Sequence, residues 1–321
     1  MRFVEAGGVR VSAVGLGTWQ FGSREWGYGD DYAQREAGAI VERAIDLGVT
    51  LLDTAEIYGF GRSERILGKA IAGRRDEVFV ATKILPLVPV PPVVRNRLAG
   101  SLRRLEVDRI DLYQVHWPNP VIPHGPMFNT LAALQREGRI AHVGVSNYPL
   151  ERWKSAEREL GGPVLSNQVE YSLAKRSPET EILPWAQANG RIVIAYSPLA
   201  QGWLSGRYDA GHRPGGVRAG NPLFLPENLD RGADLLAALR DIATAHQATP
   251  SQVALAWLLD RPNVVVIPGA SSVAQLEANV AAADLELTAD EDQRLTAASD
   301  RFRPKTMPAA IPDLVRARFG R

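Results

Sequence analysis

Short apolar segments alternate along the chain with longer segments in which apolar residues recur every three to four positions. The short segments are apolar throughout, which is typical of parallel strands covered on both faces. The longer ones have the periodicity of amphipathic helices. The predicted strands are residues 14–19, 50–53, 78–82, 110–115, 140–145, 164–169, 192–196 and 264–267. The predicted helices are residues 33–47, 63–71 with Ser63 as the cap, 92–105, 129–137, 149–160, 178–188, 233–245, 251–259 and 273–282.

This alternation predicts a single α/β domain over residues 1–321, folded as a (β/α)8 barrel, or TIM barrel. A doubly wound open sheet is the alternative. Such a sheet usually has fewer strands and a phosphate-binding loop after its first strand. Gly15 and Gly17 lack the third glycine of that loop, so we interpret them as crowded positions beside the barrel axis or a ligand.

Two further segments lie outside the alternation. Residues 3–4 and 9–11 are apolar and flank Gly7 and Gly8, which predicts an N-terminal hairpin. Residues 198–229, after the seventh strand, are rich in Gly and Pro and show no periodicity. Loops of this length are usually functional or disordered.

The composition is that of a globular protein, with 45% hydrophobic and 23% charged residues and a formal net charge of +1. Nothing in this balance points to nucleic acid or an anionic membrane as partner. The absence of Cys excludes disulfides, thiolate metal ligands and a Cys nucleophile. Residues 1–8 do not resemble a leader, and the apolar residues 78–94 contain Lys83 and four prolines, so no membrane span is expected. A cytoplasmic location follows as the expectation.

Four polar residues mark the ends of three successive predicted strands. Asp53 ends the second strand, Lys83 follows the third, His116 follows the fourth, and Tyr58 lies in the turn beyond Asp53. Each residue alone could be a cap, a surface residue or a satisfied core group. In a parallel barrel, however, the carboxyl ends of all strands share the face that holds the active site. We therefore expect the four side chains to meet there.

These four residues suit the reduction of a small-molecule carbonyl compound. A phenol has a pKa near 10 and is a poor acid at neutral pH. The Lys83 ammonium is expected to lower the pKa of Tyr58 and make it a useful general acid, with Asp53 as the partner that a buried lysine needs. His116 can donate a hydrogen bond that orients the carbonyl group. The hydride must then come from a cofactor.

The chain resembles the aldo-keto reductase superfamily from about residue 10 to residue 300. The motifs that carry the resemblance are Gly15-Leu16-Gly17-Thr18-Trp19, Asp53-Thr54-Ala55, Tyr58-Gly59, Lys83, His116, Val143-Gly144-Val145-Ser146-Asn147, Tyr196-Ser197-Pro198-Leu199 and Ile267-Pro268-Gly269-Ala270-Ser271. The resemblance implies a barrel that binds NADP(H) in extended form without a Rossmann domain. It also implies that Tyr58 is the proton donor, that Lys83 and Asp53 tune it, and that His116 orients the carbonyl.

The resemblance also implies which residues bind the cofactor. Ser146, Asn147 and Gln168 would hold the nicotinamide carboxamide, and Tyr196 would stack on the nicotinamide ring. Further cofactor-binding candidates are Gly17, Thr18, Trp19 and Asp53. Those along the pyrophosphate are Ser197, Pro198, Leu199 and Gln201, and those at the adenosine phosphate end are Gly269, Ser271, Gln275 and Asn279. Ser146 and Asn147 could instead form an ordinary turn, and Tyr196 could be a core residue. Ala278 departs from the family pattern, in which a Glu meets the adenine, so adenine binding is expected to be looser.

The choice between NADPH and NADH depends on the residues around the 2′-phosphate. Residues 269–279 contain no Lys or Arg, which taken alone favours NADH or no preference. The resemblance implies that a basic residue of the long loop meets the phosphate instead. That loop carries Arg207, Arg213 and Arg218, of which Arg218 fits best, although all three could be solvated loop charges. We predict a preference for NADPH, with NADH also accepted.

The candidate substrate residues are the aromatic side chains Trp19, Trp26, Tyr28 and Trp117. An aromatic pocket suits an apolar or aromatic carbonyl compound, but sugars also stack on Trp. No metal is expected, because His142 begins its strand roughly 13 Å below the active face and cannot join His116 as a ligand.

Two other functions are compatible with the same fold. An NAD(P)+-dependent alcohol or sugar dehydrogenase would use the same acid and base in the opposite direction. The resemblance also includes cofactor-sensing regulatory β subunits of potassium channels, in which the position of His116 resembles Asn. His116 and the three other filled positions favour the enzyme.

Overall fold

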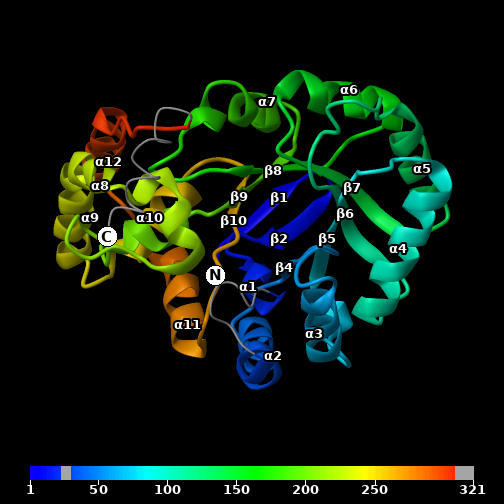
Figure 1. Cartoon of the computed structure of the whole chain (residues 1–321), viewed down its shortest axis with the longest axis horizontal. Helices are drawn as coiled ribbons and strands as arrows, with labels where there is room; N and C mark the ends of the chain where they lie inside the picture. Colours follow the sequence, from blue (N-terminus) through cyan, green and yellow to red (C-terminus); the bar gives the residue numbers. More distant parts are fainter. Residues whose placement is uncertain (23–29, 308–321) are drawn as a thin grey trace.

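The computed structural model describes residues 1–22 and 30–307 and has a parallel eight-stranded sheet at its centre (Figure 1). The strands pair in chain order. They are β3 (Leu16–Gly17), β4 (Leu51–Asp53), β5 (Phe79–Ile84), β6 (Ile110–Val115), β7 (Ile140–Ser146), β8 (Ser166–Glu170), β9 (Ile192–Tyr196) and β10 (Val264–Val266). Parallel bridges from Val14 to Val266 and from Gly17 to Gly269 join the first strand to the last. The predicted barrel is therefore confirmed.

Glycines make this closure possible. A Cβ at Gly17 would lie 2.7 Å from the carbonyl oxygen of Ile267, and a Cβ at Gly15 would lie 2.9 Å from that of Leu51. Because no side chain fits at such distances, only glycine lets the first strand approach its neighbours so closely. The interpretation of Gly15 and Gly17 as crowded positions near the barrel axis holds.

Helices surround the sheet, as Figure 1 shows. The α-helices are α1 (Trp19–Gly22), α2 (Asp30–Asp46), α3 (Arg62–Ala70), α4 (Pro91–Leu105), α5 (Gly125–Arg136), α6 (Leu150–Leu160), α7 (Ile182–Ala188), α8 (Pro226–Arg231), α9 (Ala233–Ala245), α10 (Pro250–Leu259), α11 (Val273–Ala281) and α12 (Ala289–Arg301). Short 3-10 helices are η2 (Arg75–Glu77), η3 (Ser177–Glu179), η4 (Ala200–Ser205), η5 (Gly216–Gly220), η6 (Pro222–Phe224) and η7 (Ala282–Asp284). In the part of the chain that the structure describes, no helix is long and apolar enough to cross a bilayer.

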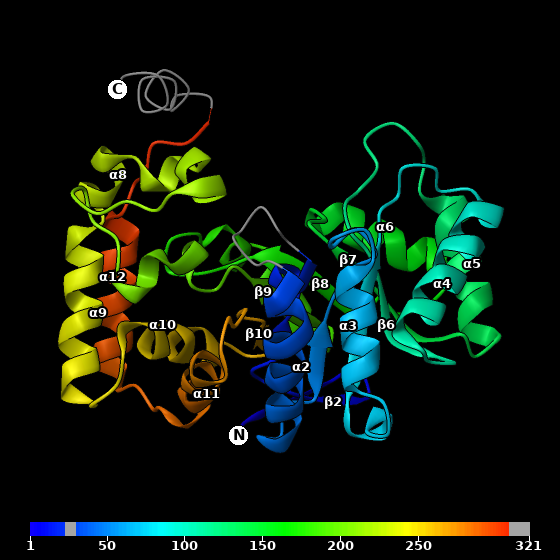
Figure 2. The ribbon, with the colours of Figure 1, turned by 60° about the horizontal axis from the view of Figure 1, so that its bottom comes forward.

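The predicted hairpin closes the N-terminal end of the barrel. Strands β1 (Phe3–Ala6) and β2 (Val9–Ser12) pair antiparallel, and Val11 joins Leu51, Leu112 and Val265 in the apolar cluster inside the barrel. A larger cluster fills the space between the sheet and the helices. Figure 2 shows β2 and the N-terminus at one end of the barrel, with α8 and long loops at the other. Apolar side chains thus fill the closed end, which leaves the carboxyl ends of the strands for polar groups.

The structure corrects several sequence-based boundaries. Ser63 does not cap α3, because the cap is Gly61 and the Ser63 side chain is buried. Lys83 lies within β5 rather than beyond it. Residues 198–229 are not one irregular loop but contain η4, η5, η6 and α8. The helix α12 was missing from the prediction, although Thr288 and Glu291 form a capping box at its start.

Candidate active site

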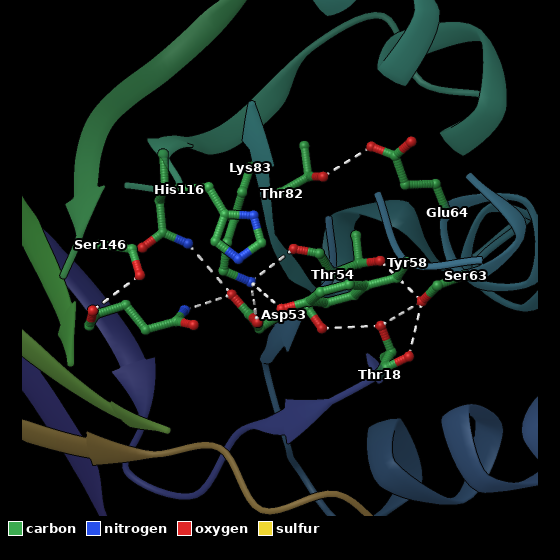
Figure 3. Close-up of polar contacts among 12 residues, drawn as sticks. Thr18, Asp53, Thr54, Tyr58, Ser63, Glu64, Thr82, Lys83, His116 and Ser146 are labelled. Atoms are coloured by element: carbon green, nitrogen blue, oxygen red, sulfur yellow. Dashed lines mark hydrogen bonds and ion pairs between the residues drawn. The ribbon is translucent and has the colours of Figure 1, made fainter. Parts of the chain in front are cut away.

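Lys83 is the centre of a polar cluster at the carboxyl ends of the strands (Figure 3). Its ammonium nitrogen lies 2.6 Å from Asp53 Oδ1, 2.9 Å from the carbonyl oxygen of Thr54 and 3.2 Å from the hydroxyl oxygen of Tyr58. The side chain of Lys83 has no exposed surface. The ring of His116 stands edge-on to that of Tyr58, with the ring centroids 5.9 Å apart. The structure therefore brings the four predicted residues together.

Strand register explains this meeting. Asp53 pairs with Ala81 across β4 and β5, and Lys83 lies two positions further along the same strand. Because side chains alternate along a strand, Ala81 and Lys83 both point into the barrel. Thr82, between them, points outward, where its hydroxyl donates to buried Glu64 at 2.7 Å. The long side chain of Lys83 therefore extends inside the barrel and reaches Asp53 and Tyr58.

Three hydroxyl groups hold the turn that carries Tyr58. The Oγ of Ser63 lies 2.7 Å from Thr18 Oγ1 and 2.9 Å from Thr54 Oγ1, and it donates to the carbonyl oxygen of Thr18. Thr18 also donates to the carbonyl oxygen of Asp53 at 2.9 Å. This cluster connects β3, β4 and α3 directly behind Tyr58, as Figure 3 shows. Its role could not be inferred from sequence, where Ser63 was interpreted as a helix cap.

Burial sets the protonation of the cluster. Burial raises the pKa of Tyr58 above its ordinary value, and the opposing effect of Lys83 is smaller. Lys83 does lower the pKa of Tyr58, as predicted, but burial outweighs it, so the net shift is upward and not toward neutrality. Burial alone would lower the pKa of Lys83, but Asp53 and Tyr58 together raise it, so Lys83 stays charged. Burial, aided by the Lys83 charge, lowers the pKa of His116 to about 2, so its ring is neutral.

The second oxygen of Asp53 accepts hydrogen bonds from two buried amides. Gln168 Nε2 lies 2.7 Å from Asp53 Oδ2, and Gln114 Nε2 lies 3.2 Å from the same oxygen. Gln168 is one of the residues predicted to bind the nicotinamide carboxamide, and its side chain contacts Asp53. Gln114 was missed, because a single polar residue inside an apolar strand gives no sign of which way it points.

Ser146, Asn147 and Tyr196 lie at neighbouring strand ends and are linked to His116. Asn147 Nδ2 lies 3.0 Å from Ser146 Oγ and 3.2 Å from the carbonyl oxygen of His116. The Tyr196 hydroxyl donates to Asn147 Oδ1 at 3.0 Å. Ser146 donates to the carbonyl oxygen of Gln168 at 2.9 Å. Figure 3 shows Ser146 on the side of Asp53 opposite Tyr58.

The loop after β9 has an unusual backbone. Ser197, Ala200 and Gln201 have positive φ angles of 49°, 49° and 56°. Strained non-glycine residues of this kind gather at functional sites. Pro198 is buried and Leu199 half-buried within the same turn.

The segment after β10 is organised by its own polar side chains. Ser271 donates to Gln275 Oε1 through both its backbone N–H and its hydroxyl, each at 2.8 Å. Asn279 donates to the carbonyl oxygen of Gly269 at 3.3 Å. On the long loop, Arg207 is exposed and Arg218 is half-buried in η5.

Two of the four candidate substrate residues flank the cluster. The Trp117 ring stacks on His116, with ring centroids 3.9 Å apart and planes 8° from parallel, and the Trp19 ring centroid lies 6.4 Å from that of Tyr58. Both tryptophans are 43% exposed. Trp26 and Tyr28 lie outside the described residues.

Exposed apolar side chains also lie on the loops after β4, β5 and β6. They are Phe60, Leu87, Val88, Val90, Val121 and Ile122. Asn119 ties two of the loops together by donating to the carbonyl oxygen of Pro86 at 2.7 Å. The mouth of the barrel is therefore apolar beside Trp117. No group of three or more His, Asp or Glu residues suited to a metal ion occurs among residues 1–22 and 30–307.

Comparisons with known proteins extend over the whole barrel. The Aldo/keto reductase family model matches residues 13–300. An uncharacterized oxidoreductase of Mycobacterium tuberculosis is 55% identical over 322 residues, which cover 100% of both chains. A methylglyoxal reductase of Escherichia coli is 34% identical and covers 94% of this chain and 95% of its own.

Solved structures agree with these sequence matches. An aldo-keto reductase from Klebsiella pneumoniae in complex with NADPH is 31% identical, with a TM-score of 0.77 and coverage of 95% of this chain and 97% of its own. A glycerol dehydrogenase from Gluconobacter oxydans is 28% identical, with a TM-score of 0.85 and the same coverage.

Proposed function

Because this chain belongs to the aldo-keto reductase family, we propose that it reduces aldehydes and ketones to alcohols with NADPH, using Tyr58 as the general acid. The observation that carries the proposal is the 3.2 Å contact between the Tyr58 hydroxyl and Lys83, a buried cation that is itself paired with Asp53. A phenol in contact with a cation can release a proton and remain stabilised as the phenolate.

The proposed reaction balances one hydride and one proton. NADPH, when bound, would supply the hydride that the carbonyl carbon needs. Tyr58 gives its proton to the carbonyl oxygen as negative charge develops there, and Lys83 stabilises the phenolate that is left until water reprotonates it. Asp53 keeps Lys83 charged. The neutral ring of His116 donates a hydrogen bond that holds the carbonyl oxygen near Tyr58.

The residues at the ends of β7, β8 and β9 fit a nicotinamide. A carboxamide needs both donors and acceptors, and the hydroxyl of Ser146 with the amides of Asn147 and Gln168 offers both. We propose that these three bind the carboxamide and that Tyr196 stacks on the ring. Gly17, Thr18, Trp19 and Asp53 would then lie beside the nicotinamide and its ribose.

The rest of the cofactor would extend along the loops after β9 and β10. We propose that Ser197, Pro198, Leu199 and Gln201 line the pyrophosphate, and that Gly269, Ser271, Gln275 and Asn279 hold the adenosine phosphate end. Arg207 and Arg218 would provide positive charge for the 2′-phosphate. The NADPH complex of the Klebsiella pneumoniae relative supports this choice of cofactor.

The apolar mouth of the barrel supports a substrate with an apolar or aromatic group next to its carbonyl. Trp19 and Trp117 stand on either side of Tyr58 and His116, and exposed aliphatic residues lie on the loops after β5 and β6. Burial of such a substituent is favourable at roughly 25 cal/mol per Å². The methylglyoxal reductase among the relatives supports a small aldehyde as the simplest substrate.

The opposite direction is the second candidate, since the likeness to a glycerol dehydrogenase supports alcohol oxidation. Initial rates with NADPH and aldehydes such as nitrobenzaldehydes, compared with rates with NADP+ and glycerol or sugars, separate the two. Turnover confined to the oxidative assay would contradict the proposed direction.

The test of the mechanism is Tyr58→Phe, which removes only the phenolic oxygen. We expect the reduction rate to fall roughly 10²–10⁴-fold while NADPH still binds. Tyr113→Phe is the matched control, because its buried hydroxyl has no hydrogen-bond partner among the described residues. Treatment with EDTA should leave the rate unchanged. A Tyr58→Phe variant that keeps more than about a third of the wild-type rate would show that Tyr58 is not the acid.

A further inference from the structure

Gln114 is a buried amide in β6 that contacts Asp53 and has no part in the mechanism described so far. We propose that Gln114 is a positioning residue that holds the Asp53 carboxylate toward Lys83, so that Gln168 can turn to the cofactor without releasing Asp53. This inference rests on the proposed function, because it assigns a task to Asp53 and Gln168 within that site.

The Asp53 carboxylate is held at both of its oxygens. Lys83 occupies Oδ1 at 2.6 Å, while Gln168 at 2.7 Å and Gln114 at 3.2 Å both donate to Oδ2. All four side chains are buried. A carboxylate that must keep a lysine charged needs its second oxygen satisfied as well, since an unsatisfied buried charge is costly.

Gln168 cannot be a permanent partner of Asp53 if it also binds the nicotinamide carboxamide. It lies in the middle of β8, where its backbone oxygen accepts a hydrogen bond from Ser146, which is another residue proposed to bind the carboxamide. Gln114 has no such second task. It lies within β6, two positions before His116, and has no exposed surface, so its contact with Asp53 lies inside the barrel.

The neighbouring strand leaves room for this amide. Gln114 pairs with Gly144 on β7, which pairs in turn with Ser166 on β8. A Cβ at Gly144 would lie 2.9 Å from Gln114 Cγ and 2.6 Å from Ser166 Oγ. Any larger residue there would push Gln114 away from Asp53. An apolar side chain at position 114 would fill the same space without the cost of burying an amide. The contact with Asp53 is therefore the physical reason for a glutamine at this position.

The test compares Gln114→Met, which keeps the length of the side chain but removes the donor, with the wild type. We expect kcat to fall about tenfold, as befits one lost hydrogen bond to a charged group. We expect the dissociation constant for NADPH to stay within about twofold, since Gln114 does not touch the cofactor. Gln168→Met should differ by weakening NADPH binding as well.

The pH profile separates positioning from a purely structural role. Removing a donor from a buried carboxylate disfavours its charged form, so the acid limb of the kcat profile should move to higher pH in Gln114→Met. Gln114→Glu has nearly the wild-type shape and places a second acid beside Asp53. Gln114→Glu should move the acid limb of the kcat profile to higher pH by more than Gln114→Met does. It also keeps the test decisive if the methionine variant is unstable.

Ser166→Ala is the matched control, because it lies in the same layer of the barrel interior and makes no contact with Asp53. It should leave kcat and the acid limb unchanged. A lower melting temperature in both Gln114 variants with no shift of the acid limb would overturn the positioning role. If Tyr58→Phe abolishes activity in that case, the proposed function stands. If Tyr58→Phe is fully active, the proposed function fails independently of Gln114.

Discussion

Lys83 touches the hydroxyl of Tyr58 at 3.2 Å from within a fully buried position. Burial nevertheless raises the pKa of Tyr58, which means that the phenol keeps its proton at neutral pH and is ready to donate it. Lys83 opposes that rise. In the proposed mechanism, Lys83 would stabilise the phenolate once the proton has left, so the contact would matter most after proton transfer.

Replacement of Lys83 by Met should raise the pKa of Tyr58 further, because the main influence that lowers it is lost. Reduction should slow by roughly 10²-fold or more, since the phenolate is no longer stabilised. Oxidation of an alcohol requires the phenolate form of Tyr58, so the rising limb of the pH profile of the oxidation rate should move to higher pH. The measurement is the pH dependence of both directions, with thermal unfolding followed in parallel. If the rising limb of the oxidation profile stayed at the same pH in Lys83→Met, this role of Lys83 would be contradicted.

His116 should make the fold sensitive to acid. Its pKa is lowered to about 2 in the folded protein, while that of an unfolded histidine is near 6.5. Its contribution to stability is therefore present above pH 6.5 and is lost as the pH falls toward 2. Across this range, one such proton lowers the free energy of unfolding by about 1.4 kcal/mol for each unit by which the pH falls.

His116→Asn should remove that slope, as urea unfolding at pH 7, 6 and 5 would reveal. His124 and His142 also have lowered pKa values and contribute to the wild-type slope, so the difference between wild type and variant is the quantity to compare. If the free energy of unfolding of the two proteins fell equally with pH, His116 would accept a proton without cost to the stability of the fold.

The sequence predicted that the side chains of Asp53, Tyr58, Lys83 and His116 would meet, because barrel topology alone brings strand ends together. Asp53, Lys83 and His116 each end or follow an apolar segment, and a parallel barrel gathers such positions on one face. The closing glycines Gly15 and Gly17 were also interpreted correctly, since they lacked the third glycine of a phosphate loop. These inferences needed only periodicity and chain order.

Features that depend on register or burial could not be predicted. Gln114 contacts Asp53 only because it lies opposite Gly144 on β7 and its side chain points into the barrel. Ser63 looked like a helix cap but is buried against Thr18. The direction of the Tyr58 pKa shift depends on how much water the turn excludes, which no motif encodes. Local pattern predicts elements, whereas these facts arise from the way the elements pack.

The buried ion pair of Glu64 and Arg104 should matter for stability. Arg104 Nε lies 2.6 Å from Glu64 Oε2, and Glu64 has no exposed surface. Arg104→Met would leave the carboxylate with the Thr82 hydroxyl and no cation, which should cost about 3–5 kcal/mol of unfolding free energy. Glu64→Gln should cost less, because an amide can still bond to Thr82.

Arg95→Met is the matched control for this experiment, since its partner Glu137 is exposed and little change is expected. Urea denaturation of the three variants provides the comparison. If Arg104→Met were no less stable than Arg95→Met, the buried pair would not stabilise the fold.

The preference for NADPH should depend on Arg218. A 2′-phosphate favours charge-assisted hydrogen bonds, and the segment after β10 contains no Lys or Arg. In that segment Gln275 Oε1 already accepts two hydrogen bonds from Ser271, so the amide nitrogen of Gln275 would be its donor to a phosphate. We therefore expect the positive charge to come from the long loop, where Arg218 is half-buried in η5.

We expect wild type to bind NADPH more tightly than NADH. Arg218→Ala should weaken NADPH binding by about 1.5–3 kcal/mol and barely affect NADH, because only NADPH carries the phosphate. Arg213→Ala removes an exposed charge from the same loop and should leave both cofactors unaffected, which separates a specific contact from the general field of the loop. Fluorescence titration of both cofactors against the three proteins provides the dissociation constants. Equal weakening of NADPH and NADH in Arg218→Ala, or tighter binding of NADH by the wild type, would mean that this loop does not recognise the phosphate.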